Sequence, residues 1–291
     1  MENRRYPISL GELERWRRLN RVTAFEARDR FVQYVVLDCI GAALIGKHLS
    51  FKGGNALRFV YGSPRSTIDL DFTADASVQD DEETIEALVA QAISRAESQH
   101  AVKMRVQRVR RNPPRRPGST TPTYSLTVAY QLPGDRFYAG FESYQGSIPQ
   151  VVKLEISLND KVCETQAVSL DPGRRSQLTV CTLEDILAEK LRSILQQRPR
   201  KRHRRQDVFD IARYYRASGA RLALVKISRF LIEKAAVREI QVTKRAYDEE
   251  ARMRASADYE KLEEQIDEEF IPFEQAWALV RELVNALDIP E

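Results

Sequence analysis

The chain has 291 residues, of which 43% are hydrophobic and 30% are charged, and its formal net charge is only +4. This length allows one large domain or two of roughly 150 residues, and the composition excludes a chain that is disordered throughout. The richest apolar run, from Phe31 to Gly46, is interrupted by Gln33 and Asp38, so it falls short of the ~18 apolar residues of a membrane span.

The N-terminal residues and the cysteines indicate a cytoplasmic protein. Early arginines are not followed by an apolar stretch, which argues against a secretory signal. Cys39, Cys163 and Cys181 are an odd number at wide spacings without a CxxC pair, so neither a disulfide framework nor a zinc site is predicted. We expect three core thiols and no membrane segment.

Helices and strands are predicted in turn along the first half of the chain. Ser9 and Glu12 match the capping box that opens a helix, and a buried helix is predicted from near Thr23 to Leu44. A short strand near 48–52, a glycine pair, a short helix and a strand over 67–72 follow. After a helix over 80–98, the alternation of apolar and polar residues predicts strands over 101–109, 124–130 and 152–158.

Beyond residue 180 the strand pattern disappears, and helices are predicted near 183–195, 205–217, 221–236 and 272–287. We therefore predict an α+β fold with a mixed sheet. Residues 1–180 would form an α/β lobe with N-terminal helices, and residues 181–291 an α-helical lobe that completes the active-site cleft.

Asp69 and Asp71, in the segment STIDLDF, are the first candidate catalytic residues. Side chains two positions apart on a strand point to the same face, so the two carboxylates lie side by side. Their repulsion is relieved by a cation, and Mg²⁺ prefers oxygen ligands of this kind. Because the pattern is short, the alternative interpretation is that the two aspartates simply lie on an exposed strand face.

Neighbouring motifs favour the catalytic interpretation. Gly53 and Gly54 end the preceding strand, where glycine lets backbone N–H groups approach a triphosphate, and the helix that begins at Asn55 would add its positive end. In the strand QVVKLEISL, Glu155 points away from the apolar positions and is a candidate third ligand of a two-cation site. It could equally be an ordinary outward-facing residue.

Three charged residues of the helical half are further candidates. Lys190 falls within the apolar stripe of its predicted helix, where it would either contact a triphosphate or extend past the edge of the core. Asp207 and Asp210 lie one helical turn apart and can face the same cleft. Complementing the helix dipole is their alternative role.

Two basic clusters predict a surface for a polyanion. Residues 103–116 contain seven Lys or Arg, and residues 198–205 contain six. Neutralising phosphates releases counterions and favours association, so we expect RNA to bind here, although a solvated surface is the alternative. The candidate RNA-binding residues are Arg108, Arg110, Arg111, Arg200, Lys201 and Arg202.

In three segments the chain resembles the AbiEii/AbiGii toxin nucleotidyltransferases, which include the MenT toxins. The segments are FKGGNALRFVYGSPRSTIDLDF, VVKLEIS and TLEDILAEKLRSILQQRPRKRHRRQDVFDI, and the resemblance spans roughly residues 30 to 215. It implies the fold of the DNA polymerase β-like nucleotidyltransferase superfamily. It also implies a toxin that is paired with a cognate antitoxin. The toxin would use Mg²⁺, or Mn²⁺, to add nucleotides from an NTP to the acceptor end of tRNA, and so block translation.

The resemblance also assigns roles by position. It implies that Gly53 and Gly54 bind phosphates and that Arg65 and Thr67 lie beside the nucleotide. Asp69, Asp71 and Glu155 become metal ligands, and Lys190 and Asp207 the later catalytic motifs, with Asp210 less strongly implied. Thr67 replaces the serine that is frequent in the family, and Glu155 replaces a frequent aspartate. RNA modification has two alternatives. One is an enzyme that transfers NMP to a protein hydroxyl, and the other is a binding protein without turnover.

Overall fold

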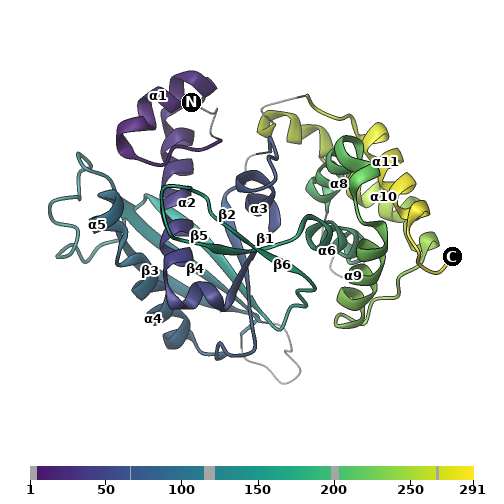
Figure 1. Cartoon of the computed structure of the whole chain (residues 1–291), viewed down its shortest axis with the longest axis horizontal. Helices are drawn as coiled ribbons and strands as arrows, with labels where there is room; N and C mark the ends of the chain where they lie inside the picture. The colour runs from purple at the N-terminus through teal and green to yellow at the C-terminus, as the bar shows by residue number, and fades with distance from the viewer. Residues whose placement is uncertain (1–4, 66, 115–121, 198–202, 267–268) are drawn as a thin grey trace. The chain divides into compact units, whose positions relative to one another are not determined.

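The computed structural model describes residues 5–65, 67–114, 122–197, 203–266 and 269–291. The chain forms two compact units (Figure 1). Unit 1 comprises Met1–Gly62, Thr67–Asp160 and Gln166–Val180, and unit 2 comprises Ser63–Ser66, Lys161–Thr165 and Cys181–Glu291. Most of the strands belong to unit 1 and the later helices to unit 2, so the predicted α+β fold is confirmed.

A mixed sheet forms the centre of unit 1, with the strand order β3-β4-β5-β2-β1-β7-β6. β2 runs parallel to β5 and antiparallel to β1, β7 runs parallel to β1, and β4 runs antiparallel to β3 and β5. The strands are β1 (Leu49–Lys52), β2 (Asp69–Ala74), β3 (Lys103–Asn112), β4 (Thr123–Gln131), β5 (Val151–Leu158), β6 (Thr165–Val168) and β7 (Leu178–Cys181).

Two helices cover the apolar face of this sheet. α2 packs on β5 and contacts α4, which packs on β3 and β4. Apolar residues that alternate along the central strands are buried beneath them, among them Leu70, Leu126 and Leu154. The helices of unit 1 are α1 (Leu10–Asn20), α2 (Ala24–Ala42), α3 (Gly53–Phe59), α4 (Glu82–Ile93) and α5 (Ala96–His100), with the 3₁₀ helix η1 (Leu44–Lys47).

The start of α2 is fixed by a capping box. The Thr23 hydroxyl accepts a hydrogen bond from the Glu26 N–H, and the Glu26 carboxylate accepts one from the Thr23 N–H. The capping box predicted at Ser9 is wrong: α1 begins there without a side-chain cap, and Glu12 instead accepts from the backbone of Ile8.

Unit 2 is built mainly from helices that pack against one another. α6 packs against α9 and α8, and α8 packs against α11. Thr182 caps α6 by accepting from the Asp185 N–H. None of the described helices has the length and apolar character to cross a membrane. The elements are α6 (Leu183–Leu195), α8 (Arg205–Ser218), η2 (Gly219–Arg221), α9 (Leu224–Ala236), η3 (Lys244–Ala246), α10 (Glu249–Ser256), η4 (Tyr259–Gln265) and α11 (Phe273–Ala286).

Candidate active site

Asp69 and Asp71 project from the polar face of β2. Leu70 and Phe72 are fully buried in the core, whereas the two aspartates alternate to the opposite side and are half-buried. The alternation predicted from the sequence therefore places the two carboxylates on one face of the sheet.

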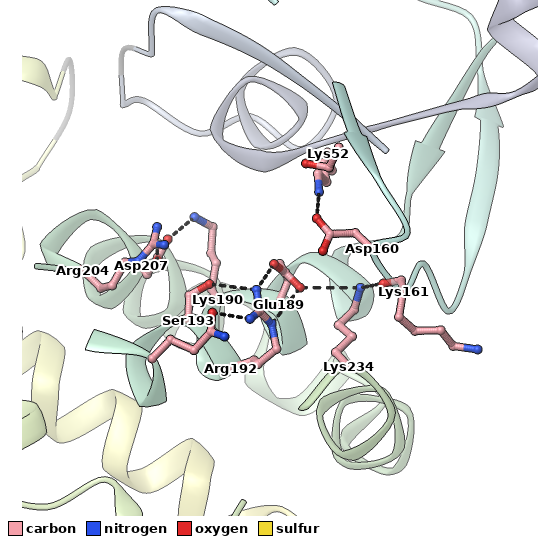
Figure 2. Close-up of polar contacts among 12 residues, drawn as sticks. Lys52, Asp160, Lys161, Glu189, Lys190, Arg192, Ser193, Arg204, Asp207 and Lys234 are labelled. Atoms are coloured by element: carbon pink, nitrogen blue, oxygen red, sulfur yellow. Dashed lines mark hydrogen bonds and ion pairs between the residues drawn. The ribbon is translucent and has the colours of Figure 1, made fainter. Parts of the chain in front are cut away.

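The neighbouring strands surround this pair with charged residues. β5 sets Glu155 opposite Asp71 and Lys153 opposite Asp69, and β1 sets Lys52 opposite Asp71 on its other side. Register partners in a sheet point to the same face, so two lysines flank the three carboxylates. Lys52 also donates to Asp160, with 3.0 Å between Nζ and Oδ2 (Figure 2).

The Asp69 carboxylate has an incomplete set of hydrogen bonds. Its Oδ1 is buried and accepts none within the described part of the chain. Burial raises the pKa of Asp69, and the positive charge of Lys153 offsets part of that rise. Among the described residues, no three His, Cys, Asp or Glu side chains are arranged to hold a metal ion. The cation site of Asp69, Asp71 and Glu155 stays a prediction.

Gly53 lies against the carboxylate of Asp71. Its φ is +73°, and a Cβ at this position would lie 2.3 Å from Oδ2 of Asp71. Glycine is therefore required here by both the backbone conformation and the close approach to a carboxylate. Gly54 follows in the first turn of α3. The binding of phosphates by these two glycines stays a prediction.

Two buried amides hold the backbone that leads into β2. Asn55 Nδ2 donates to the carbonyl oxygens of Asp69, at 2.8 Å, and Thr67, at 3.3 Å. Gln33 Nε2 donates to the carbonyl oxygens of Ile68, at 3.0 Å, and Thr67, at 3.3 Å. The Thr67 hydroxyl itself is buried and has no hydrogen-bond partner among the described residues. These supporting roles were not predicted from the sequence, although Gln33 interrupts an apolar run and Asn55 directly follows the glycine pair.

Basic residues of β3 divide between the two faces of the sheet. Arg108 and Arg110 are exposed on the polar face. Arg111 lies on the other face, where its guanidinium donates to Asp80 with 2.8 Å between Nη2 and Oδ2, and it is only 7% exposed. Arg111 is therefore much less available to RNA than the other two. Three further candidates, Arg200, Lys201 and Arg202, lie outside the described residues.

A buried cluster of four charged residues lies within unit 2. Arg65 donates to both carboxylate oxygens of Asp210, with Nε–Oδ1 at 3.1 Å and Nη2–Oδ2 at 2.9 Å. Lys190 Nζ lies 2.7 Å from Oδ1 of Asp207, the pair drawn in Figure 2, and 2.8 Å from Oδ2 of Asp210. The structure thus brings Arg65, Lys190 and Asp207 together and gives Asp210 a more central place than the sequence predicted.

The charges of this cluster balance one another. Burial disfavours the charged form of Lys190, but Asp207 and Asp210 outweigh it and raise the pKa of the ammonium group. Burial also opposes ionisation of Asp210, but Arg65 and Lys190 lower the pKa of its carboxyl group. Lys190 is 7% exposed, so it does not extend to solvent. Oδ2 of Asp207 is a buried acceptor without a hydrogen bond from the described residues, and Arg204 Nη1 lies 3.8 Å from it.

Comparison with known proteins gives one family. The model of the nucleotidyl transferase AbiEii toxin family, of a type IV toxin–antitoxin system, matches residues 35–279. No curated protein sequence matches the chain.

Solved structures with a similar fold include two bacterial proteins. MenT4, a nucleotidyltransferase toxin from Mycobacterium tuberculosis H37Rv, is 17% identical with a TM-score of 0.55, and the match covers 91% of this chain and 85% of that one. JHP933 from Helicobacter pylori is 13% identical with a TM-score of 0.51, and the match covers 91% of this chain and 92% of that one. At these identities the likeness shows the fold alone.

Proposed function

The chain belongs to the nucleotidyl transferase AbiEii toxin family of type IV toxin–antitoxin systems, and from this premise we propose that it transfers NMP from an NTP to a hydroxyl group of RNA. The acceptor that we propose is the acceptor end of tRNA, and the other product is pyrophosphate. A modified acceptor end cannot take part in translation, which accounts for the toxicity.

The observation that carries this proposal is the charge pattern of the polar sheet face. Asp69 and Asp71 lie side by side, Lys52 and Lys153 flank them, and the same face continues to exposed arginines on β3. Nucleotidyl transfer depends on positioning and on neutralising the charge of the phosphates, and a mixed set of carboxylates and cations serves both purposes.

We propose Mg²⁺, or Mn²⁺, as the cation, held by Asp69 and Asp71 with Glu155. These oxygen ligands suit a hard cation, and the buried Oδ1 of Asp69 lacks a hydrogen-bond donor that a cation would replace. When bound, the cation would neutralise charge on the triphosphate and activate the attacking hydroxyl. Lys153 favours the ionised form of Asp69, which a metal ligand must have.

Lys190 and Asp207 are the second group of proposed catalytic residues. Lys190 keeps its positive charge although it is buried, because two carboxylates raise the pKa of its ammonium group. To contact a phosphate it would exchange one carboxylate partner for a phosphate oxygen, while Asp210 remains bound to Arg65. Arg65 and Thr67 would then lie beside the nucleotide, as the family pattern implies.

The proposed substrates also imply a location and a partner. NTP and tRNA occur together in the cytoplasm, where we propose that the enzyme acts. The family supplies toxins of toxin–antitoxin systems, so we propose that a cognate antitoxin protein restrains this one.

The direct test incubates the purified protein with each α-labelled NTP, Mg²⁺ and total tRNA, followed by separation of RNA from protein. We expect label in the tRNA fraction with at least one NTP, loss of labelling with EDTA, and restoration by Mg²⁺ or Mn²⁺. Label in a protein band would identify a protein hydroxyl as the acceptor. Absence of label in both fractions, together with salt-sensitive RNA binding, would identify a binding protein without turnover.

A further inference from the structure

A bulge in β3 changes the direction of its basic side chains. The pairing with β4 passes from Val106 opposite Val128 to Arg108 opposite Thr127, so Gln107 is the extra residue. A bulge of this kind places two consecutive residues opposite one partner and re-aims their side chains. Gln107 and Arg108 therefore both lie opposite Thr127, on the polar face of the sheet.

A pocket of about 620 Å³ opens at this bulge. Among the described residues, its lining combines arginine, amide and hydroxyl groups and contains no acidic side chain. This volume lies within the roughly 300–1,000 Å³ of typical ligand sites. The lining residues are Arg105, Val106, Gln107, Arg108, Thr127, Gln145, Gly146 and Ser147.

Hydrogen bonds hold one wall of the pocket in place. Arg105 Nη1 donates to the carbonyl oxygen of Tyr144 at 2.6 Å, and its Nη2 donates to that of Gly146 at 3.0 Å. Gln107 Nε2 donates to the Ser147 hydroxyl at 3.0 Å. The side chains of Arg105 and Gln107 thus form hydrogen bonds within the wall of the pocket. Arg108, by contrast, is exposed and has no hydrogen bond or ion pair to any residue that the structure describes.

The pocket lies in the same transverse row of the sheet as Asp69, one member of the proposed catalytic pair. Asp69 is the register partner of Lys153, Lys153 that of Thr127, and Thr127 that of Arg108. Adjacent strands are about 4.8 Å apart, so the row spans roughly 14 Å over three steps. At the ~3.4 Å rise of a stacked strand this distance corresponds to about four nucleotides.

We propose that this pocket, the strand pocket, binds a nucleotide of the acceptor RNA about four positions before the hydroxyl that reacts near Asp69 and Asp71. Arg108 contacts a backbone phosphate there, and Lys153 contacts the backbone between the pocket and the aspartates. The proposal rests on the proposed transfer to RNA. The absence of carboxylates from the described lining, together with Arg108 and Lys153 in the same transverse row, favours a single-stranded polyanion over a protein segment.

The test uses RNA hairpins with single-stranded 3′ extensions of one, two, four and six nucleotides as acceptors. For the wild type, kcat/KM should rise between two and four nucleotides and then level off. Arg108→Ala should lower kcat/KM about tenfold for the six-nucleotide extension, as the loss of one charged contact predicts, and less than about twofold for the one-nucleotide extension. The KM for NTP should stay unchanged, and Arg108→Lys should retain part of the length effect.

Arg15→Ala is the matched control, because Arg15 is exposed on α1, which packs against α2 on the other side of the sheet. It should behave as wild type with every acceptor. An Arg108→Ala variant that matches Arg15→Ala at all lengths would overturn the strand pocket while leaving RNA transfer intact. The strand pocket would likewise be overturned, with RNA transfer intact, if the wild type labels tRNA but none of the hairpins. Label in protein alone would overturn both proposals.

Discussion

At the scale of single residues, Gly53 links the backbone to the proposed catalytic pair. Gly53→Ala should abolish nucleotidyl transfer, because the new Cβ would lie 2.3 Å from Oδ2 of Asp71 and displace that carboxylate. The matched control is Gly134→Ala, which shares a positive φ, +91°, but where no described residue other than its chain neighbours comes within 4 Å of the new Cβ. Each variant should lose about 1 kcal/mol of stability in urea unfolding from backbone strain. Equal activity of the two variants would refute the role of Gly53.

Asp69 should oppose folding at neutral pH. Burial raises the pKa of the Asp69 carboxyl group, so this group ionises at a lower pH in the unfolded chain than in the folded protein. The free energy of unfolding therefore falls as pH rises from the unfolded pKa to the folded pKa, and it stays lower at higher pH. Asp69→Asn should therefore raise the free energy of unfolding by about 1 kcal/mol at pH 7 while abolishing transfer, and the gain should vanish below about pH 4.

Asp75→Asn is the control for this measurement. Burial opposes ionisation of Asp75, but hydrogen bonds from Ser77 and His48 together outweigh it and lower the pKa of the carboxyl group, and the residue is exposed. This variant should show no gain in stability at pH 7. A gain for Asp69→Asn that is independent of pH would rule out the electrostatic explanation.

At the scale of secondary structure elements, the buried cluster joins α6, α8 and the segment Ser63–Ser66. Asp210→Asn should destabilise the protein by about 3 kcal/mol in urea unfolding, because Arg65 and Lys190 would lose a buried carboxylate partner. Glu249→Gln breaks the exposed pair with Arg252 and should cost much less stability, because solvent screens a surface pair. Comparable losses in the two variants would mean that the buried pair contributes no more than a surface pair.

Long elements could be predicted from the sequence because their hydrophobic periodicity repeats several times. α2, α6 and the strands β3, β4 and β5 all appear where alternation or helical spacing indicates them. β6 and β7 have four residues each, too few to show a period, and α10 has little apolar periodicity beyond Ala251 and Ala255. These three elements were not predicted.

The candidate site could be predicted only in part. Alternation gives the face of Asp69 and of Glu155, but the sequence does not show which strands pair. The transverse row from Asp69 to Arg108 depends on three strand registers and a bulge, none of which a sequence pattern contains. The pairing of Arg65 with Asp210 was likewise hidden, since Arg65 lies more than a hundred residues before Asp210 in the chain.

At the scale of the whole molecule, the two units do not follow a single division of the chain. Unit 2 takes Ser63–Ser66 and Lys161–Thr165 from within residues 1–180, which were predicted to form the first lobe. These segments supply Arg65 to Asp210, the carbonyl oxygen of Lys161 to Lys234, and the Cys163 N–H to Asp185.

A fragment of residues 181–291 should therefore not fold stably on its own. Without Arg65 and the segment 161–165, the buried Asp210, Asp185 and Lys234 lose partners, at a cost of several kcal/mol. Circular dichroism and limited proteolysis should show a labile fragment, and a fragment of residues 161–291 should be more resistant but still less stable than the same region in the full chain. Cooperative unfolding of 181–291 at the temperature of the full protein would contradict this account.

We propose that Asp69 and Asp71 carry out nucleotidyl transfer, and labelling of tRNA by α-labelled NTP measures this activity directly. Asp71→Asn should reduce labelling by at least about a hundredfold, the scale expected for losing a group that stabilises the transition state, whereas Asp75→Asn, just beyond the end of β2, should label as wild type. Undiminished labelling by a folded Asp71→Asn protein would contradict the account.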